Sequence, residues 1–231
     1  YWNMDIKIQY DSTYRLNYIL IDDKKLFFKR GMSNKKILKM FRGLNIEQDP
    51  KSPHRYLTDF FELKNNSVVY DVGAAEGSFS LKHIESIDKL FIFETDPLWA
   101  EALRATFHPW NRKVKIIEKF VSDSVTNNKI TLDQFTKNNP PPDFVKIDVD
   151  GEEMNLLKGF NDYLSKIKKS VKIAICTYHK QNDESEIGAF LSKREFNHNP
   201  SEGSMIFYFD QKFNKPYLRR GLLRAEKLIE E

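Results

Sequence analysis

Val68–Phe79 reads VVYDVGAAEGSF, and this stretch of the 231-residue chain decides the fold. Its apolar first half is typical of a buried strand, and Gly73 and Gly77 suit the tight turn that follows. A helical pattern begins directly after the turn, over Gly77–Ile84. A strand, a glycine turn and a helix in this order open nucleotide-binding α/β domains, so the stretch predicts such a domain with a ligand beside the turn.

Apolar runs and helical patterns alternate along the rest of the chain. Strands are expected at Ser67–Val72, Lys89–Glu94, Val114–Glu118, Asp143–Val149, Val171–Tyr178 and Met205–Asp210. Helices are expected at Gly77–Ile84, Pro97–Phe107, Glu152–Leu164 and Glu184–Ser192. Apolar strands separated by helices indicate a parallel sheet that is covered on both faces. The predicted fold class is therefore α/β, with a doubly wound, mostly parallel sheet whose ligands bind at the carboxyl ends of its strands.

The first 66 residues have a different pattern. Arg15–Arg30 is expected to form a β-hairpin that turns near Asp22–Lys25, and Ser33–Arg42 and Pro53–Leu63 are expected to be helices. The extension is short for a core of its own, so we expect it to pack on the main domain and cover the pocket. The predicted organisation is an extension over residues 1–66, a main domain over 67–215 and a charged carboxyl-terminal helix over 216–231.

The composition restricts the class of protein. The net charge of +4 is small for this length, so it permits anionic partners without requiring nucleic acid. The single cysteine, Cys176, excludes a disulfide framework within the chain and fits a reducing compartment, so we expect a cytoplasmic protein. No stretch approaches the length of a membrane span, and the opening residues do not read as a signal peptide. The oligomeric state cannot be read from the sequence.

The glycine turn favours a cationic ligand. Its spacing, Gly73-x-x-x-Gly77, lacks the middle glycine of a dinucleotide site, and Asp71 and Glu76 would repel a pyrophosphate. S-adenosylmethionine carries a sulfonium and an ammonium group, which suit these acids better. Glu94 ends the next predicted strand, where an acid accepts hydrogen bonds from ribose hydroxyls. The cofactor-binding candidates are Asp71, Gly73, Ala74, Ala75, Glu76, Gly77, Glu94, Ser122 and Asp148.

Each of these residues also has a purely structural interpretation. A tight strand–helix turn needs no ligand, and Glu94 could cap the helix that begins near Pro97, as Asp96 could. Ser122 or Asp123 lies where an adenine is expected, but such residues are common in any turn. The order of acid, glycine turn and second acid favours nucleoside binding.

Three motifs in this order carry a resemblance to a known family: DVGAAEGSF (71–79), FIFETDP (91–97) and FVKIDVDGEE (144–153). With them, residues 67–180 resemble the FkbM family of S-adenosylmethionine-dependent methyltransferases, and EQDPKSPHRYL (47–57) resembles the segment that precedes the domain in some members. The resemblance implies a class I methyltransferase fold and O-methylation of a hydroxyl on a sugar, a glycan precursor or a secondary metabolite. Two positions depart from the pattern: Ala75 where many methyltransferases have Gly, and Thr177 where members often carry an acid.

The chemistry is expected at the ends of two strands. Asp148 ends an apolar strand beside the first one, so it should reach the same crevice as Gly73. His179 ends the neighbouring strand, and histidine is the usual general base near neutral pH. Asp148 and His179 are therefore the catalytic candidates. Asp148-x-Asp150-Gly151 fails as an EF-hand because Lys146 and Leu157 occupy ligand positions. Glu152 and Glu153 are interpreted as the acidic first turn of a helix.

The acceptor side is less defined. His54, Arg55 and Tyr178 are the substrate-contacting candidates, with His54 a second candidate base if the extension folds over the pocket. A divalent metal stays open, because hard oxygen ligands and a histidine could hold one, but the sequence shows no full ligand set. The partners expected are a small-molecule or glycan acceptor and no nucleic acid.

Two other functions compete with O-methylation. Amino-group methyltransferases that act on nucleic acid place an Asn/Asp-Pro-Pro-aromatic motif just after the fourth strand, whereas Asn139–Pro142 precedes that strand here. A noncatalytic nucleoside-binding protein would bind the cofactor and methylate nothing. The sequence contains no code for the acceptor.

Overall fold

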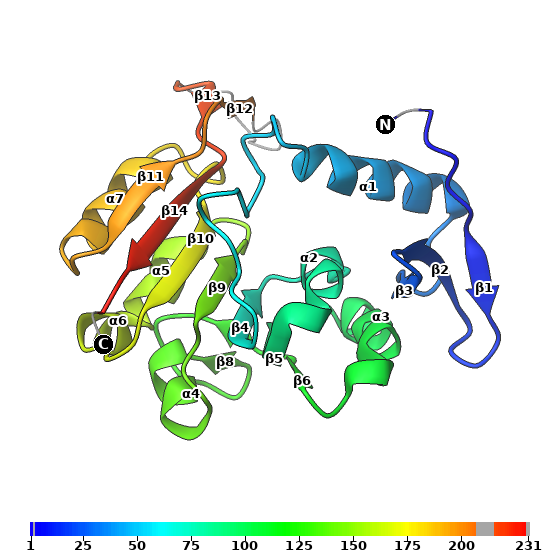
Figure 1. The fold of residues 1–231 in the computed structure, drawn as a ribbon, viewed down its shortest axis with the longest axis horizontal. Coiled ribbons are helices and arrows are strands. Elements are labelled where there is room, and N and C mark those ends of the chain that lie inside the picture. The colour runs from blue at the N-terminus through cyan, green and yellow to red at the C-terminus, as the bar shows by residue number, and fades with distance from the viewer. Residues whose placement is uncertain (2, 207–214, 230–231) are drawn as a thin grey trace.

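A seven-stranded sheet organises the chain. The computed structural model describes residues 1, 3–206 and 215–229. The strand order is β11-β14-β10-β9-β4-β5-β6, which Figure 1 shows from left to right. The bounds are β4 Ser67–Val72, β5 Ile87–Phe93, β6 Val114–Ile117, β9 Phe144–Ile147, β10 Val171–Cys176, β11 Asn197–Pro200 and β14 Leu222–Lys227. Strands β6, β5, β4, β9 and β10 pair in parallel, and β14 runs antiparallel to both of its neighbours. The predicted doubly wound, mostly parallel sheet is confirmed.

Helices cover both faces of this sheet. Their bounds are α2 Ser78–Lys82, α3 Pro97–Phe107, α4 Leu132–Asn138, α5 Glu153–Lys158, α6 Asn161–Ser165 and α7 Asp183–Ser192, with short 3₁₀ turns at Ile84–Ser86 and His108–Trp110. Successive residues of β4 enter different cores: Val69 packs with α2 and α3, and Tyr70 packs with α4–α7. Alternation of this kind buries both faces of the strand, which explains why it is apolar throughout. Two small pairs of strands complete the domain: β7 Phe120–Val121 with β8 Lys129–Ile130, and β12 Met205–Ile206 with β13 Leu218–Arg219.

The extension packs on one face of the domain. Strands β1 Gln9–Asp11, β2 Leu16–Ile21 and β3 Lys24–Phe27 form an antiparallel sheet, followed by α1 Asn34–Glu47. The hairpin turns at Asp22 and Asp23, which both have positive φ as a two-residue hairpin turn requires. The extension shares a hydrophobic core with α2 and α3, and Phe27 N–H donates to Thr106 Oγ1 at 3.1 Å. Figure 1 shows this sheet beside α3, with α1 extending from it toward the carboxyl ends of the central strands.

Three sequence-based expectations are wrong. The tail is not a helix: β13 and β14 occupy its described part, because Leu222, Leu223 and Ala225 are buried when β14 pairs with β10 and β11. Residues 53–63 form turns and a single bridge instead of a helix. The helix expected at 152–164 is divided into α5 and α6. Of the strand expected at 205–210, only Met205–Ile206 lies within the described residues.

The register of the parallel strands brings their carboxyl ends together at one edge of the sheet. Val72 of β4 pairs with Ile147 of β9, and Ile147 pairs with Ile175 of β10. The residues that follow these strands, including Gly73, Asp148 and Thr177, therefore meet at the carboxyl edge of the sheet. Among the described helices, none has the length and apolar character needed to cross a membrane.

Candidate functional site at the carboxyl edge of the sheet

The glycine turn is built by close approach of two backbones. Gly73 has φ +75°, and a Cβ added there would lie 1.8 Å from the backbone oxygen of Asp148, so no other residue fits. Gly77 has φ +82° and would meet Leu103 at 2.6 Å. Ala75 also has a positive φ, 48°, and its N–H donates to Glu94 Oε2 at 2.8 Å. The methyl group of Ala75 is thus accommodated in a left-handed turn that Glu94 of the next strand end holds in place.

A buried ion pair between Lys146 and Asp71 lies beneath the glycine turn and contacts its backbone. Lys146 Nζ lies 3.0 Å from Asp71 Oδ1 and donates to the Gly73 carbonyl at 2.7 Å. Asp71 is fully buried and accepts from Ser80 Oγ at 2.7 Å. Burial disfavours the charge of Lys146, but the carboxylates of Asp71 and Asp148 outweigh it and raise its pKa. Asp71 lies beneath the turn and lines neither of the two cavities that are described in the next paragraph. Its position therefore does not support the expected direct contact of Asp71 with the cofactor.

Two cavities meet at Gly73 and Asp148, which line both. One cavity, of about 460 Å³, extends along the ends of β5 and β7 and is lined by Glu94, Phe120 and Ser122 among others. The other, of about 480 Å³, lies between α1 and the glycine turn and is lined by Ala74, Ala75, Glu76, Glu47 and Tyr56 among others. Each has the size of a small-molecule site. An elongated ligand could therefore pass from one cavity to the other across the end of β4.

Asp148 is the centre of the site. Its Oδ2 accepts from the hydroxyl of Tyr56 at 2.9 Å, and its Oδ1 accepts from Tyr178 at 3.4 Å. His54 Nε2 and His179 Nε2 lie on its two sides, each 3.7 Å from a carboxylate oxygen. Burial alone would raise the pKa of Asp148, but the charge of Lys146 and the two histidines lower it, so the carboxylate is held in its ionised form.

His179 lies between acids on both of its ring nitrogens. Nδ1 is 2.7 Å from Oε1 of Glu153, and Nε2 is 3.5 Å from Asp150 and 3.7 Å from Asp148. Burial opposes protonation of the ring, but Glu153 and then Asp148 and Asp150 outweigh it and raise the pKa of His179. The Nε2 atom therefore faces the same carboxylate that lines both cavities, as a proton acceptor at this position would.

The extension supplies a second histidine. His54 is buried, packs against the rings of Tyr56 and Tyr178, and has its Nε2 3.5 Å from Cys176 Sγ. Burial lowers its pKa. The extension thus reaches the carboxyl edge through His54, as predicted. Arg55, in contrast, turns away toward Asp59 at 3.9 Å and lines a different hollow.

Two groups of side chains have the spacing of metal ligands. They are His54 with Asp148 and Cys176, and Asp148 with Glu153 and His179; in each group the potential ligand atoms lie within 4.8 Å of one another. In the second group, the 2.7 Å between Nδ1 of His179 and Oε1 of Glu153 has the length of a hydrogen bond. In the first, Asp148 Oδ2 already accepts from Tyr56. In each group, therefore, at least one potential ligand atom already contacts another protein atom.

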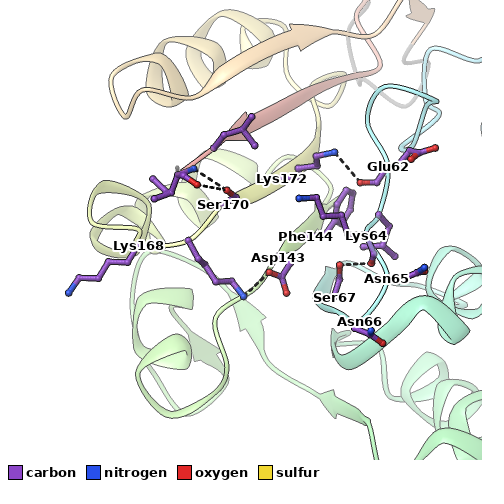
Figure 2. Close-up of a pocket in the computed structure, with 14 residues that line it drawn as sticks. Glu62, Lys64, Asn65, Asn66, Ser67, Asp143, Phe144, Lys168, Ser170 and Lys172 are labelled. Atoms are coloured by element: carbon purple, nitrogen blue, oxygen red, sulfur yellow. Dashed lines mark hydrogen bonds and ion pairs between the residues drawn. The ribbon is translucent and has the colours of Figure 1, made fainter. Parts of the chain in front are cut away.

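A further hollow lies at the opposite, amino edge of the sheet. It is lined by Lys64, Lys168, Lys169, Lys172 and Asp143 among others, and Figure 2 shows it between the starts of β9 and β10 and the segment that leads into β4. Lys169 pairs with Asp143 at 2.8 Å, and Lys172 donates to the Glu62 carbonyl at 3.2 Å. This hollow shares no lining residue with the two cavities at the glycine turn.

Comparison with known proteins identifies the family. The profile described as "Methyltransferase FkbM domain" matches residues 17–211, which is most of the chain. The chain belongs to the FkbM methyltransferase family. Its FkbM domain has the class I methyltransferase fold, and S-adenosylmethionine is the cofactor. No protein with curated function matches the sequence significantly.

Solved structures agree with this fold. An FkbM methyltransferase from Methylobacillus flagellatus KT superposes with a TM-score of 0.56 at 15% identity, over 72% of this chain and 44% of that one. The present chain thus spans less than half of that relative. A precorrin-6Y C5,15-methyltransferase from Geobacter metallireducens GS-15 has a TM-score of 0.50 at 13% identity, over 87% and 94% of the two chains. These likenesses are similarities of fold.

The charges of the FkbM domain fit its cofactor. Three carboxylates, of Glu47, Glu76 and Asp148, line the cavity beside α1 together with three lysines, of which Lys36 and Lys39 are exposed and Lys146 is buried. Burial, and then the charges of Asp148 and Glu76, raise the pKa of Glu47 to about 7, and burial also raises that of Glu76. A cationic ligand beside these carboxylates would favour their ionised forms. The sulfonium and ammonium groups of S-adenosylmethionine supply such charge.

Sequence reasoning misses the roles of two side chains of the FkbM site. The pattern alone makes Glu153 an ordinary acid in the first turn of a helix, yet it is fully buried against His179. Tyr56 is expected near the pocket with His54 and Arg55 but is given no role, although its hydroxyl donates a shorter hydrogen bond to Asp148 than that of Tyr178 does. The sequence signal that could have indicated Tyr56 is the polar segment that contains it and precedes the first core strand. Nothing in the sequence separates Glu153 from Glu152.

Proposed function

We propose that this FkbM chain is an O-methyltransferase that methylates a hydroxyl of a sugar, a glycan precursor or a secondary metabolite, in the cytoplasm. The observation that carries the proposal is the contact of His179 with Asp148: Nε2 of His179 lies 3.7 Å from Asp148, and Asp148 lines both cavities. A neutral hydroxyl is a weak nucleophile, and removal of its proton during attack helps it displace a sulfonium. A base beside the methyl donor is therefore what this reaction needs.

The cofactor supplies an electrophilic methyl group on sulfur when it is bound. In the proposed arrangement, Glu94 accepts hydrogen bonds from the ribose, and Ser122 and Phe120 border the adenine in the first cavity. The residues of the turn, Ala74–Glu76, face the amino-acid end in the second cavity. Asp148 lies between them and positions the cofactor ammonium or the acceptor hydroxyl.

The acceptor side is proposed to involve the residues around Asp148. His179 takes the hydroxyl proton on Nε2, and His54 and Tyr178 border the acceptor from the extension and from the end of β10. The side chains of Tyr56 and Tyr178 hold the Asp148 carboxylate in position. Because Arg55 points toward Asp59, it is not retained as a substrate contact.

A nucleic-acid amino-methyltransferase is disfavoured by the position of one loop. Asn139–Pro142 leads into β9 at the amino edge, whereas Asp148 and Asp150 occupy the carboxyl end of that strand. Acids there would repel a phosphate backbone. A noncatalytic cofactor-binding protein is disfavoured by the buried contact of His179 with Glu153, which cofactor binding does not require.

The test has two stages. Calorimetry should detect binding of S-adenosylhomocysteine, and transfer of a labelled methyl group should be screened by mass spectrometry against glycan precursors, nucleotide sugars, secondary metabolites and RNA. We expect methylation at oxygen, strongly slowed in His179→Ala and reduced together with cofactor affinity in Asp148→Asn. Methylation of a nitrogen, or of RNA alone, would replace the proposal. A chelator should leave the rate unchanged.

A further inference from the structure

Two adjacent glutamates at the start of α5 have different environments. Glu152 is exposed, and its side chain accepts from Asn155 Nδ2 at 2.8 Å. Glu153 is fully buried, and its Oε1 lies 2.7 Å from Nδ1 of His179. An acid in a first helical turn is favoured by the helix dipole wherever solvent reaches it, so the dipole explains Glu152 without explaining the burial of Glu153.

Burial of Glu153 is costly. A carboxylate removed from water loses its hydration, and this destabilises the fold unless charges and hydrogen bonds replace the lost water. Its Oε1 accepts from Val149 N–H at 3.2 Å and contacts His179, but Oε2 is buried without a hydrogen-bond partner among the described residues. If Glu153 served only to hold the loop between β9 and α5, we would expect hydrogen bonds to both of its carboxylate oxygens.

The contact fixes the direction of the imidazole. With Nδ1 against Glu153, Nε2 is directed at Asp148 and Asp150, 3.7 and 3.5 Å away. A carboxylate beside Nδ1 favours the tautomer that carries its proton there, because the neutral ring has one donor and one acceptor nitrogen. The unprotonated nitrogen is then Nε2, on the side of the cavities.

We propose that Glu153 is the positioning residue of the site, which holds the proton of His179 on Nδ1 so that the unprotonated Nε2 can accept the proton of the acceptor hydroxyl. This inference rests on the proposed function of His179. In the transfer, the acceptor O–H bond breaks and its proton goes to Nε2. The new O–CH₃ bond forms as the S–CH₃ bond breaks, and the electron pair of that bond remains on sulfur, which becomes a neutral thioether.

Other charged groups near the ring enter any titration of His179. Among the described residues they are Asp148 and Asp150 after β9, Asp183 of α7, Lys180 next in the chain, His54 of the extension, and Arg219 of β13, which donates to the His179 carbonyl. Glu153 lies at hydrogen-bond distance from a ring nitrogen, closer than either Asp148 or Asp150. Removing its charge should therefore have the largest effect.

Nitrogen-15 NMR of the histidine rings tests the inference without an acceptor. The chain has five histidines, and His179→Gln identifies the signal of interest. In the wild-type protein, above the titration of His179, we expect the neutral ring to carry its proton on Nδ1. A proton on Nε2 would overturn the inference, and the tautomer itself is read in the wild-type protein.

Three variants separate position from charge. In Glu153→Gln the Val149 N–H favours the amide oxygen at the Oε1 position, so the tautomer should persist while the pKa of His179 falls by about one pH unit or more. Glu153→Leu should lose the tautomer as well. Glu152→Gln is the matched control and should change neither. An unaltered His179 titration in Glu153→Gln would also overturn the inference, whereas failure to find a methylated hydroxyl would count against the proposed function alone.

Discussion

The two edges of the central sheet both carry an ion pair between neighbouring strands, and they differ in burial. At the carboxyl edge, Lys146 and Asp71 lie 3.0 Å apart with side chains that are 5% and 0% exposed. At the amino edge, Lys169 and Asp143 lie 2.8 Å apart with 37% and 36% exposed. The distances are alike, but solvent screens the second pair and not the first.

This difference shows why the number of charges does not locate a site. The amino-edge hollow has four lysines in its lining, which extend into solvent or pair at its rim (Figure 2). The carboxyl edge instead gathers Asp148, Glu153 and His179 where water cannot hydrate them fully. Buried charges cost free energy of folding, so a chain that keeps them together has another use for them.

The largest effect is expected from the base at the carboxyl edge. His179→Ala should reduce turnover of the acceptor found in the metabolite screen by about 10²–10⁴-fold, the usual contribution of a general base. Affinity for S-adenosylhomocysteine should stay nearly unchanged, because His179 lines neither cavity. Lys169→Ala at the amino edge is the control and should keep full turnover. An active His179→Ala enzyme with an unchanged pH profile would refute the role.

The two ion pairs can be compared directly by unfolding in urea. Lys146→Met leaves the fully buried Asp71 without its partner, so the free energy of unfolding should fall by about 3–5 kcal/mol. Lys169→Met removes an exposed pair and should cost at most about 1 kcal/mol. Equal losses in the two variants would mean that burial is not what separates the edges.

A smaller effect is expected at the end of β5. Glu94 lines the first cavity and also accepts from the N–H groups of Ala75 and Asp96, each at 2.8 Å. Glu94→Ala should weaken binding of S-adenosylhomocysteine by about 1–3 kcal/mol, the cost of losing a hydrogen bond to a charged group. Calorimetry measures it, with Glu62→Ala at the amino edge as the control. Unchanged affinity would place the ribose elsewhere.

The smallest effect is a dependence of stability on pH. The pKa of His179 is raised in the folded protein from its ordinary value of 6.5, because Glu153, Asp148 and Asp150 favour the charged ring more than burial opposes it. The stabilisation is therefore complete below about pH 6.5 and is lost as the pH rises through the higher folded pKa. Each pH unit between the unfolded and the folded pKa contributes about 1.4 kcal/mol. The stability difference between wild type and His179→Gln should shrink with rising pH.

The control for this measurement is Asn65→Ala at the amino edge, which removes no titrating group. Its stability difference from the wild type should be the same at each pH. If the His179→Gln difference grew with pH instead, the folded protein would disfavour the charged ring, and the environment assigned to His179 would be wrong.

The main domain could be predicted because its signals are local. The glycine turn, the apolar strands and the helix patterns each lie within a dozen residues, and the expected neighbours β4 and β9 do pair. The tail could not be predicted in the same way. LLRAEK (222–227) is rich in residues that favour helices, but pairing with β10 and β11 overrides that preference and buries its apolar side chains.

The site residues that could be predicted are those that directly follow a strand of the parallel sheet. Gly73, Glu94, Asp148 and His179 meet because they follow parallel strands, and the polar segment just before the first core strand led us to expect His54 near them. Glu153 and the irregular path of residues 53–63 depend on packing between distant segments. A Cβ on Gly221 would lie 2.0 Å from the Pro53 carbonyl, a close approach that no local pattern encodes.

The position of strand β14 affects the order in which parts of the chain can fold during synthesis on the ribosome. It is the last strand described, yet it is inserted between β10 and β11, and Arg224 donates to the Tyr56 carbonyl across 168 positions. Until β14 has been synthesised, one side of β10 has no strand to pair with, and an unpaired edge is prone to association with other chains. Closing so large a loop is slow, so the segment that carries His54 and Tyr56 becomes fixed among the last events of folding.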